Sequence, residues 1–136
     1  IIFDTNPNLG VINQNIFYFV DSIILVSDVS LNAIQGAELF TFLWEENIED
    51  LGIENNIKAL IINNFDKRIN LAKDLQDYYL SEAEFKDILV EIPIPGSVAM
   101  KDTSINHLPL VILQPHHQVT ISIKRVVKDL IVREVF

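Results

Sequence analysis

The chain has 136 residues, no cysteine and a formal net charge of −9 at pH 7. The lack of cysteine excludes a disulfide framework and a thiolate metal site, and the acidic balance argues against a surface that binds nucleic acid over its whole area. Hydrophobic residues make up 49% of the chain, yet no apolar run approaches the roughly 18 residues of a membrane span. We therefore expect one domain, or part of one, spanning residues 1–136 of a cytoplasmic protein.

The first ten residues combine an apolar run with a carboxylate and a polar turn. Residues 1–3 are apolar, Asp4 follows them, and the turn over residues 5–10 contains a proline and ends at Gly10. This pattern predicts a buried parallel strand that carries Asp4 to its carboxyl end, where open α/β sheets bind ligands. A carboxylate there can hold the water shell of a Mg²⁺ ion. The alternative is that Asp4 only caps the helix that follows.

Two further strands and two helices are predicted between residues 11 and 62. Apolar residues recur at helical spacing over residues 11–20, and residues 23–26 and 57–62 are apolar runs of strand length. The helix between these strands ends at Leu51 and Gly52. Its apolar face consists of Ile34, Ala37, Phe40, Leu43, Trp44 and Ile48.

The second half of the chain continues this alternation. A helix is predicted from the spacing of Leu71, Leu75, Tyr78 and Tyr79, and the Ser-Glu-Ala-Glu sequence of residues 81–84 suits a capping box that starts a further turn. Residues 88–92 predict a fourth strand, residues 101–109 a loop, and residues 110–113 a short edge strand. The terminal helix has an apolar stripe of Val119, Ile123, Val126, Val127, Leu130 and Ile131, and a basic face of Lys124, Arg125, Lys128 and Arg133.

The alternation of strands and helices predicts an α/β fold with a doubly wound, mostly parallel sheet and helices on both of its faces. Polar residues that follow the strands then share one edge of the sheet. Metal binding is not predicted at His116 and His117, because they are adjacent rather than four residues apart and no carboxylate lies near them in the sequence.

The segment after the first apolar run resembles the Walker B segment of the ParA/Soj/MinD family of deviant-Walker ATPases. That segment usually has an apolar run, Asp, a small residue, two prolines, a small polar residue, Leu and Gly. The matching residues are Asp4, Thr5, Pro7, Leu9 and Gly10. Asn6 stands where the first proline is usual.

The resemblance continues in order along nearly the whole chain. Residues 33–36 resemble an Ala-Leu-Glu-Gly motif at the equivalent helix of the family, and residues 65–68 resemble its aromatic-Asp-x-Arg motif. Residues 94–98 are similar to its Ile-Pro-Arg-Asn-Val loop, with Gly96 in place of the arginine. The following loop, residues 101–109, differs from the family pattern except at Asp102 and Pro109.

The resemblance implies a sheet of the P-loop NTPase type that is N-terminally truncated, because the family's phosphate loop would lie upstream of residue 1. Asp4 would be the catalytic and metal residue, acting on Mg²⁺. Thr5, Pro7 and Gly10 would belong to a switch loop that senses the γ-phosphate.

The adenine base of ATP would be flanked by Asn63 and Pro95, in the same interpretation. The alternative for Asn63 is ordinary turn chemistry at the end of a strand. Asp66 and Arg68 would either contact a second subunit or brace their own loop. Lys124, Arg125 and Lys128 would either contact DNA phosphates or form a solvated helix face.

The implied function is that of a ParA-like ATPase in plasmid or chromosome partitioning, which forms an ATP-dependent homodimer and associates with nonspecific DNA and a ParB-like partner protein. A MinD-like membrane-cycling ATPase is one alternative. A degenerate, non-catalytic interaction module is another, favoured by Asn6, Gly96 and the altered loop over residues 101–107. The 136 residues alone are expected not to hydrolyse ATP, because they contain no phosphate loop.

The family's phosphate-loop strand would lie between the strands predicted at residues 1–3 and 23–26. Without it, we expect one of four outcomes: direct pairing of these two strands, insertion of a segment from a second copy, pairing with an upstream polypeptide, or marginal stability.

Overall fold

The structure is a computed structural model that describes residues 1–6 and 10–136. Within this part the fold is mixed α/β, with a two-stranded parallel sheet and seven helices. The strands are β1 (Ile23–Ser27) and β2 (Ile57–Ile62). The helices are α1 (Val11–Phe19), α2 (Leu31–Leu51), α3 (Asn70–Ser81), α4 (Ala83–Lys86), α5 (Ala99–Asn106), α6 (Leu110–Leu113) and α7 (Gln118–Val132).

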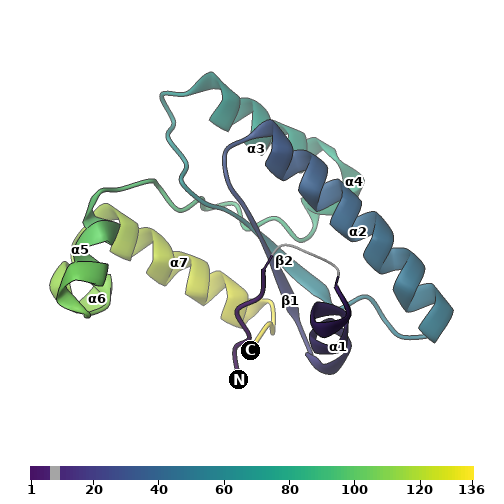
Figure 1. Cartoon of the computed structure of the whole chain (residues 1–136). Helices are drawn as coiled ribbons and strands as arrows, with labels where there is room; N and C mark the ends of the chain where they lie inside the picture. Colours follow the sequence, from purple (N-terminus) through teal and green to yellow (C-terminus); the bar gives the residue numbers. More distant parts are fainter. Residues whose placement is uncertain (7–9) are drawn as a thin grey trace.

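Helices cover both faces of the sheet. Figure 1 shows α2, α3 and α4 on one side of β1 and β2, and α7 on the other. The reason lies in the strand sequences, which are apolar on both faces, as expected for a strand buried between two helical layers. One face places Ala59 and Ile61 against Val126 and Leu130 of α7. The opposite face places Leu60, Ile62 and their neighbours against α3 and α4.

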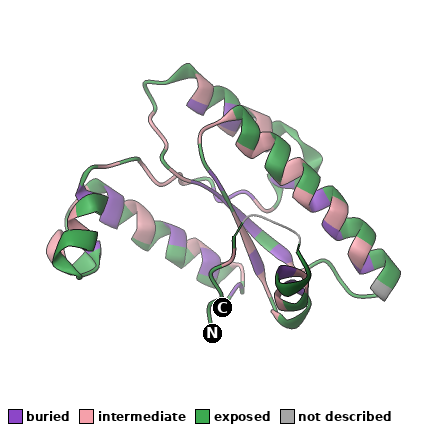
Figure 2. Cartoon of the chain, viewed as in Figure 1, coloured by how far each residue is buried: buried purple, intermediate pink, exposed green. Residues whose placement is uncertain are grey.

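The helix between the two strands follows its predicted pattern. The Ser30 hydroxyl accepts a hydrogen bond from the Ala33 amide at 3.1 Å and caps the start of α2. Gly52, with φ of 65°, ends the helix in the left-handed conformation that glycine adopts without strain. Trp44 is fully buried, and Figure 2 shows that the buried positions of α2 and α7 face the sheet. The predicted apolar face of α2 is confirmed.

Asn56 joins α1, α2 and the start of the sheet. Its Oδ1 accepts a hydrogen bond from Trp44 Nε1 at 3.0 Å, and its Nδ2 donates to the carbonyls of Phe17 and Val20 at 2.9 and 3.0 Å. The Asn56 carbonyl accepts from the Ile23 amide at 2.7 Å. These bonds satisfy polar groups around an aromatic cluster in which Phe17 and Trp44 meet edge to face.

The strand predicted at residues 88–92 is present only in part. The Leu60 amide donates to the Ile88 carbonyl and the Val90 amide donates to the Leu60 carbonyl, both at 2.8 Å, so this segment begins to pair in parallel with β2. The Ile62 carbonyl then accepts from the Ile94 amide at 2.9 Å rather than from residue 92. The regular ladder is therefore interrupted between residues 90 and 94.

Two predictions for the region after Pro95 were wrong. The loop predicted over residues 101–109 contains most of α5, and the edge strand predicted at residues 110–113 is helix α6. The Pro109 carbonyl accepts hydrogen bonds from the Ile112 and Leu113 amides at 2.9 and 3.2 Å, which closes a helical turn directly after the proline. Four apolar residues can form either structure, and here the local turn prevails.

The strand predicted at residues 1–3 is also wrong. Residues 1–6 have no regular secondary structure, and the side chains of Ile1, Ile2 and Phe3 are exposed. The physical reason is the lack of a partner, because an isolated strand has no ladder to satisfy its backbone. The partner of β1 among the described residues is β2 alone. Direct pairing of residues 1–3 with β1 is therefore not the outcome seen, and the other three outcomes remain predictions.

None of the described helices is both long and apolar enough to cross a membrane.

Candidate functional site at the carboxyl edge of the sheet

The segments that follow β1 and β2 meet at one edge of the sheet. The Asn63 amide donates to the Ser27 carbonyl at 2.8 Å, and Asn64 Nδ2 donates to Asp28 Oδ1 at 2.9 Å. Asn64 has φ of 54°, a left-handed conformation that asparagine tolerates better than most residues. The two turns are thus fixed to one another at the edge where parallel sheets bind ligands.

The loop that contains Pro95 lies beside the turn after β2. The Phe65 amide donates to the Ile94 carbonyl at 3.0 Å, and the Gly96 amide donates to the Phe65 carbonyl at 3.4 Å. The structure therefore brings Asn63 and Pro95, the two predicted base-flanking residues, onto neighbouring segments. A Cβ atom at Gly96 would lie 3.6 Å from the backbone of Asn64, which is an ordinary contact. A lack of room for a side chain therefore does not explain why residue 96 is glycine rather than the arginine usual in the family's loop.

A buried hydrogen bond joins the end of β1 at this edge to helix α3. The hydroxyl groups of Ser27, at the end of β1, and Tyr79, on α3, lie 2.9 Å apart, and both residues are buried. Burial raises the pKa of the Tyr79 phenol, so this side chain stays neutral at physiological pH. Sequence reasoning placed Tyr79 in the core but did not foresee its partner, which is 52 residues away.

The predicted pair of Asp66 and Arg68 is present. Arg68 donates from Nε to Asp66 Oδ1 at 2.9 Å and from Nη2 to Oδ2 at 2.7 Å, and its amide also donates to Oδ1 at 3.0 Å. The side-chain hydrogen bond from Arg68 is the main reason that the pKa of Asp66 falls to about 2. The pair braces its own turn, while the Arg68 side chain is 84% exposed.

Asp4 and the predicted switch loop are not part of this edge in any described contact. Asp4 is exposed on the irregular segment before α1, and Thr5 is half-buried. Asn13 Nδ2 donates to the Asn6 carbonyl at 3.0 Å and to its Oδ1 at 2.6 Å, which attaches this segment to α1. Gly10 is the residue before the first turn of α1. Pro7 lies outside the described residues.

No group of three or more His, Asp or Glu side chains in the described part of the chain is placed to share a metal ion. The donor chemistry of Asp4 nonetheless fits Mg²⁺, because this ion keeps several waters and needs only one or two carboxylates.

The basic face predicted on the last helix is present in part. Lys124, Arg125 and Lys128 are exposed on α7, and ion pairs in the described regions join only Arg68 to Asp66 and Arg133 to Asp129. Arg133 does not belong to the free face, contrary to the prediction. It also donates to the carbonyls of Asp87 and Leu89 at 3.0 and 2.9 Å. The apolar stripe is narrower than predicted, since Val127 and Ile131 are exposed.

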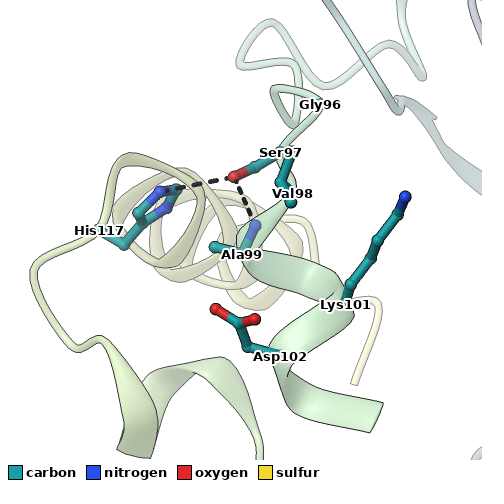
Figure 3. A pocket seen from close by; sticks show the side chains of 7 residues that line it. All are labelled: Gly96, Ser97, Val98, Ala99, Lys101, Asp102 and His117. Atoms are coloured by element: carbon teal, nitrogen blue, oxygen red, sulfur yellow. Dashed lines mark hydrogen bonds between the residues drawn. The ribbon is translucent and has the colours of Figure 1, made fainter. Parts of the chain in front are cut away.

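An open depression of the surface lies between the loop after Pro95 and the start of α7. Figure 3 shows Ser97, Asp102 and His117 around it, with the Lys101 side chain extending away from them. Sequence reasoning considered His117 only as a metal ligand. Its position directly before an apolar-periodic helix is the signal that could have identified it as a capping residue.

A scan against protein-family models and a search of curated proteins found no match to this chain.

Proposed function

We propose that the chain belongs to a ParA-like ATPase domain with a doubly wound sheet of the P-loop NTPase type, and that the intact protein acts in plasmid or chromosome partitioning. The observation that carries this proposal is the convergence of three segments at one edge of a parallel sheet. Asp28, Asn63 and Pro95 each lie on one of these segments. Hydrogen bonds join the segment of Asp28 to that of Asn63, and the segment of Asn63 to that of Pro95. This arrangement supports a nucleotide site, since the carboxyl edge is where such sheets bind nucleotides.

ATP would be bound with its base between Asn63 and Pro95. Asp4 would hold Mg²⁺ through water, and the ion would neutralise charge on the phosphates. The four glycines of the chain form no phosphate loop, so the proposal requires that loop to come from outside residues 1–136. Catalysis in such a site consists of positioning and charge stabilisation of the transferred phosphoryl group.

DNA would be bound on the outer face of α7. Three cations lie there without an ion pair in the described part of a chain that is otherwise strongly acidic. Lysine and arginine contacts to phosphates give affinity without sequence preference. Dimerisation on ATP, with Asp66 and Arg68 at the contact, and capture of a ParB-like partner complete the proposal.

The test of the proposal begins with the coding sequence upstream of Ile1. A glycine-rich loop followed by Lys-Ser or Lys-Thr supports the ATPase, whereas an unrelated sequence favours the non-catalytic interaction module. Isothermal titration of the 136-residue chain with Mg-ATP is then expected to show millimolar binding or none, because the phosphate-loop amides and lysine are missing. Micromolar binding would contradict this account of the site.

A MinD-like membrane-cycling ATPase is the second candidate, and one observation favours it. Ile131 and Val132 are exposed beside the cations of α7, and Val132 is 81% exposed. A basic helix with exposed apolar residues suits an anionic membrane surface. Binding of the intact protein to DNA and to anionic liposomes, measured side by side with ATP present, separates the two candidates.

A further inference from the structure

The loop after Pro95 and the first turn of α7 are joined through the side chain of His117. Its Nδ1 accepts a hydrogen bond from the Val119 amide at 3.2 Å, so His117 caps α7. Its Nε2 lies 3.5 Å from Ser97 Oγ, which also accepts from the Ala99 amide at 3.1 Å. Figure 3 shows Ser97 between the imidazole and the start of α5. One ring thus contacts both structural elements.

These contacts determine the tautomer of the imidazole. Because Nδ1 accepts the Val119 amide proton, the neutral ring carries its own proton on Nε2, which then donates toward Ser97 Oγ. In this arrangement His117 cannot take a proton from Ser97. The pair is therefore a structural link and not a nucleophile with its general base.

Apolar packing joins the same two elements. Ala99, Leu110 and Val119 form a small buried cluster, with Ile94 and Ile123 packed against it. The cluster therefore draws on the loop at residue 94, the first residue of α5, the first residue of α6 and the first two turns of α7. Ile94 also packs against the larger cluster that contains Val126 and Leu130 of α7, so the small cluster adjoins the packing on that face of the sheet.

Two further hydrogen bonds surround this cluster. Thr120 Oγ1 donates to the Gln114 carbonyl at 2.8 Å, and Gln114 Nε2 donates to Asp102 Oδ2 at 3.3 Å. Together with the His117 contacts, they connect α5, the turn before α7 and α7 itself. A displacement of the loop at residues 94–99 therefore has a continuous path of contacts to the start of α7.

We propose that His117 couples the loop at residues 94–99 to the first turn of α7, so that a nucleotide bound at this loop changes the affinity of α7 for a polyanion. This inference rests on the proposed function, which places the base beside Pro95 and DNA phosphates at Lys124 and Arg125. Coupling of this kind is reciprocal, so DNA on α7 also changes the affinity of the loop for nucleotide.

The first experiment needs no ligand. Hydrogen exchange of the amides of residues 119–121 is compared in the wild type, Ser97→Ala, His117→Asn and the double variant. Asn at position 117 keeps an N-cap acceptor but is too short to bridge to Ser97. We expect Ser97→Ala to speed exchange by at least about twofold, the lower end for residues in contact, and to have no effect when Asn occupies position 117.

An equal effect of Ser97→Ala in both backgrounds, or no effect in either, overturns the coupling. Ser104→Ala is the matched control, because Ser104 is exposed on α5 and belongs to the same short helix. It is expected to leave exchange at residues 119–121 unchanged in either background.

The second experiment measures DNA affinity of the intact protein with and without ATP. His117→Asn is expected to bind each ligand alone as the wild type does, and to lose the dependence of DNA affinity on ATP. An ATP dependence equal to that of the wild type overturns the coupling. If the wild type binds neither ATP nor DNA, the proposed function is contradicted. The hydrogen-exchange experiment then still tests whether His117 couples the loop at residues 94–99 to α7.

Discussion

The Ser27 hydroxyl and the Tyr79 hydroxyl form a hydrogen bond of 2.9 Å inside the core, between the last residue of β1 and the inner face of α3. Ser27 directly precedes Asp28, so the bond fixes the start of the turn after β1. It is the only place among the described contacts where a side chain of β1 is hydrogen-bonded to a helix.

Replacement of Ser27 by Ala is expected to destabilise the protein by about 1–3 kcal/mol, because it leaves the buried Tyr79 hydroxyl without its partner. Urea denaturation of the single and double variants measures the effect. Tyr79→Phe provides the control. In the Tyr79→Phe background, Ser27→Ala should lower the free energy of unfolding by much less than it does in the wild type. If the effects of the two substitutions on this free energy simply add, the bond does not contribute to stability.

The pKa of Asp66 provides a second prediction. Its value of about 2, against an ordinary 3.8, arises mainly from the side-chain hydrogen bond with Arg68. A lowered carboxyl pKa means that the stabilising contribution is complete above the unfolded pKa and is lost as pH falls toward 2. An NMR titration of Asp66 should show this midpoint, and Arg68→Ala should return it close to 3.8. Lys67→Ala should move it far less, because the coulombic effect of Lys67 is the smallest of the causes.

Glu84 is expected to respond to pH in the opposite sense. Burial raises the pKa of its carboxyl above the usual range, and the nearby carboxylates of Glu45 and Glu38 act in the same direction. The folded state therefore favours the protonated Glu84 carboxyl. Its contribution to the stability of the folded protein is complete below the pKa of the unfolded state and is lost as pH rises through the pKa of the folded state.

Glu84→Gln should consequently stabilise the protein at pH 7, and its advantage over the wild type should shrink at pH 4. Thermal unfolding at the two pH values provides the measurement. Glu54→Gln, on the exposed connection before β2, is the control and should change little. Destabilisation by Glu84→Gln at pH 7 would mean that a favourable contact of the carboxylate outweighs its repulsion.

The basic face of α7 gives a functional prediction for the intact protein. Lys124→Gln combined with Lys128→Gln should weaken DNA binding. It should also reduce the steepness with which the logarithm of the binding constant falls with the logarithm of the salt concentration, by about 0.9 for each lost phosphate contact. Fluorescence anisotropy at several salt concentrations measures both effects. Lys58→Gln removes an exposed charge from β2 and provides the control. Equal losses in the control and in the α7 variants would rule out a localised DNA surface.

The sequence predicts correctly those helices and strands that are determined by residues close together in the chain. The helix α2 is specified by the Ser30 cap, by a regular apolar face and by Gly52, and β1 and β2 by apolar runs of strand length. The turn predicted near residue 83 also exists as α4, although no side-chain hydrogen bond caps it. Each of these depends on residues within a few positions of one another.

The failures concern segments whose structure depends on distant partners. Residues 1–3 are as apolar as β1, yet they lack a strand to pair with in the described structure. The segment at residues 88–92 begins a ladder that is interrupted near Pro93. At the site, the sequence indicated Asn63 and Pro95 separately, but tertiary hydrogen bonds are what bring their two segments together. The contact of His117 with Ser97 spans 20 residues and has no periodic signature.

The outer edge of β1 has a consequence for work with the protein in solution. The strand reads Ile-Ile-Leu-Val-Ser, and its Val26 side chain is 65% exposed. The five residues of β1 include no charge and no proline, and the irregularity in its pairing, between Ile23 and Ile24, lies in the ladder with β2 rather than on the outer edge. Charges, prolines and bulges are the features by which natural sheets discourage edge-to-edge aggregation. Soluble yield of the 136-residue chain, in which β2 is the one partner of β1 among the described residues, should therefore fall steeply with protein concentration. Val26→Lys should restore the yield, because a lysine at this edge disfavours pairing of β1 with another copy.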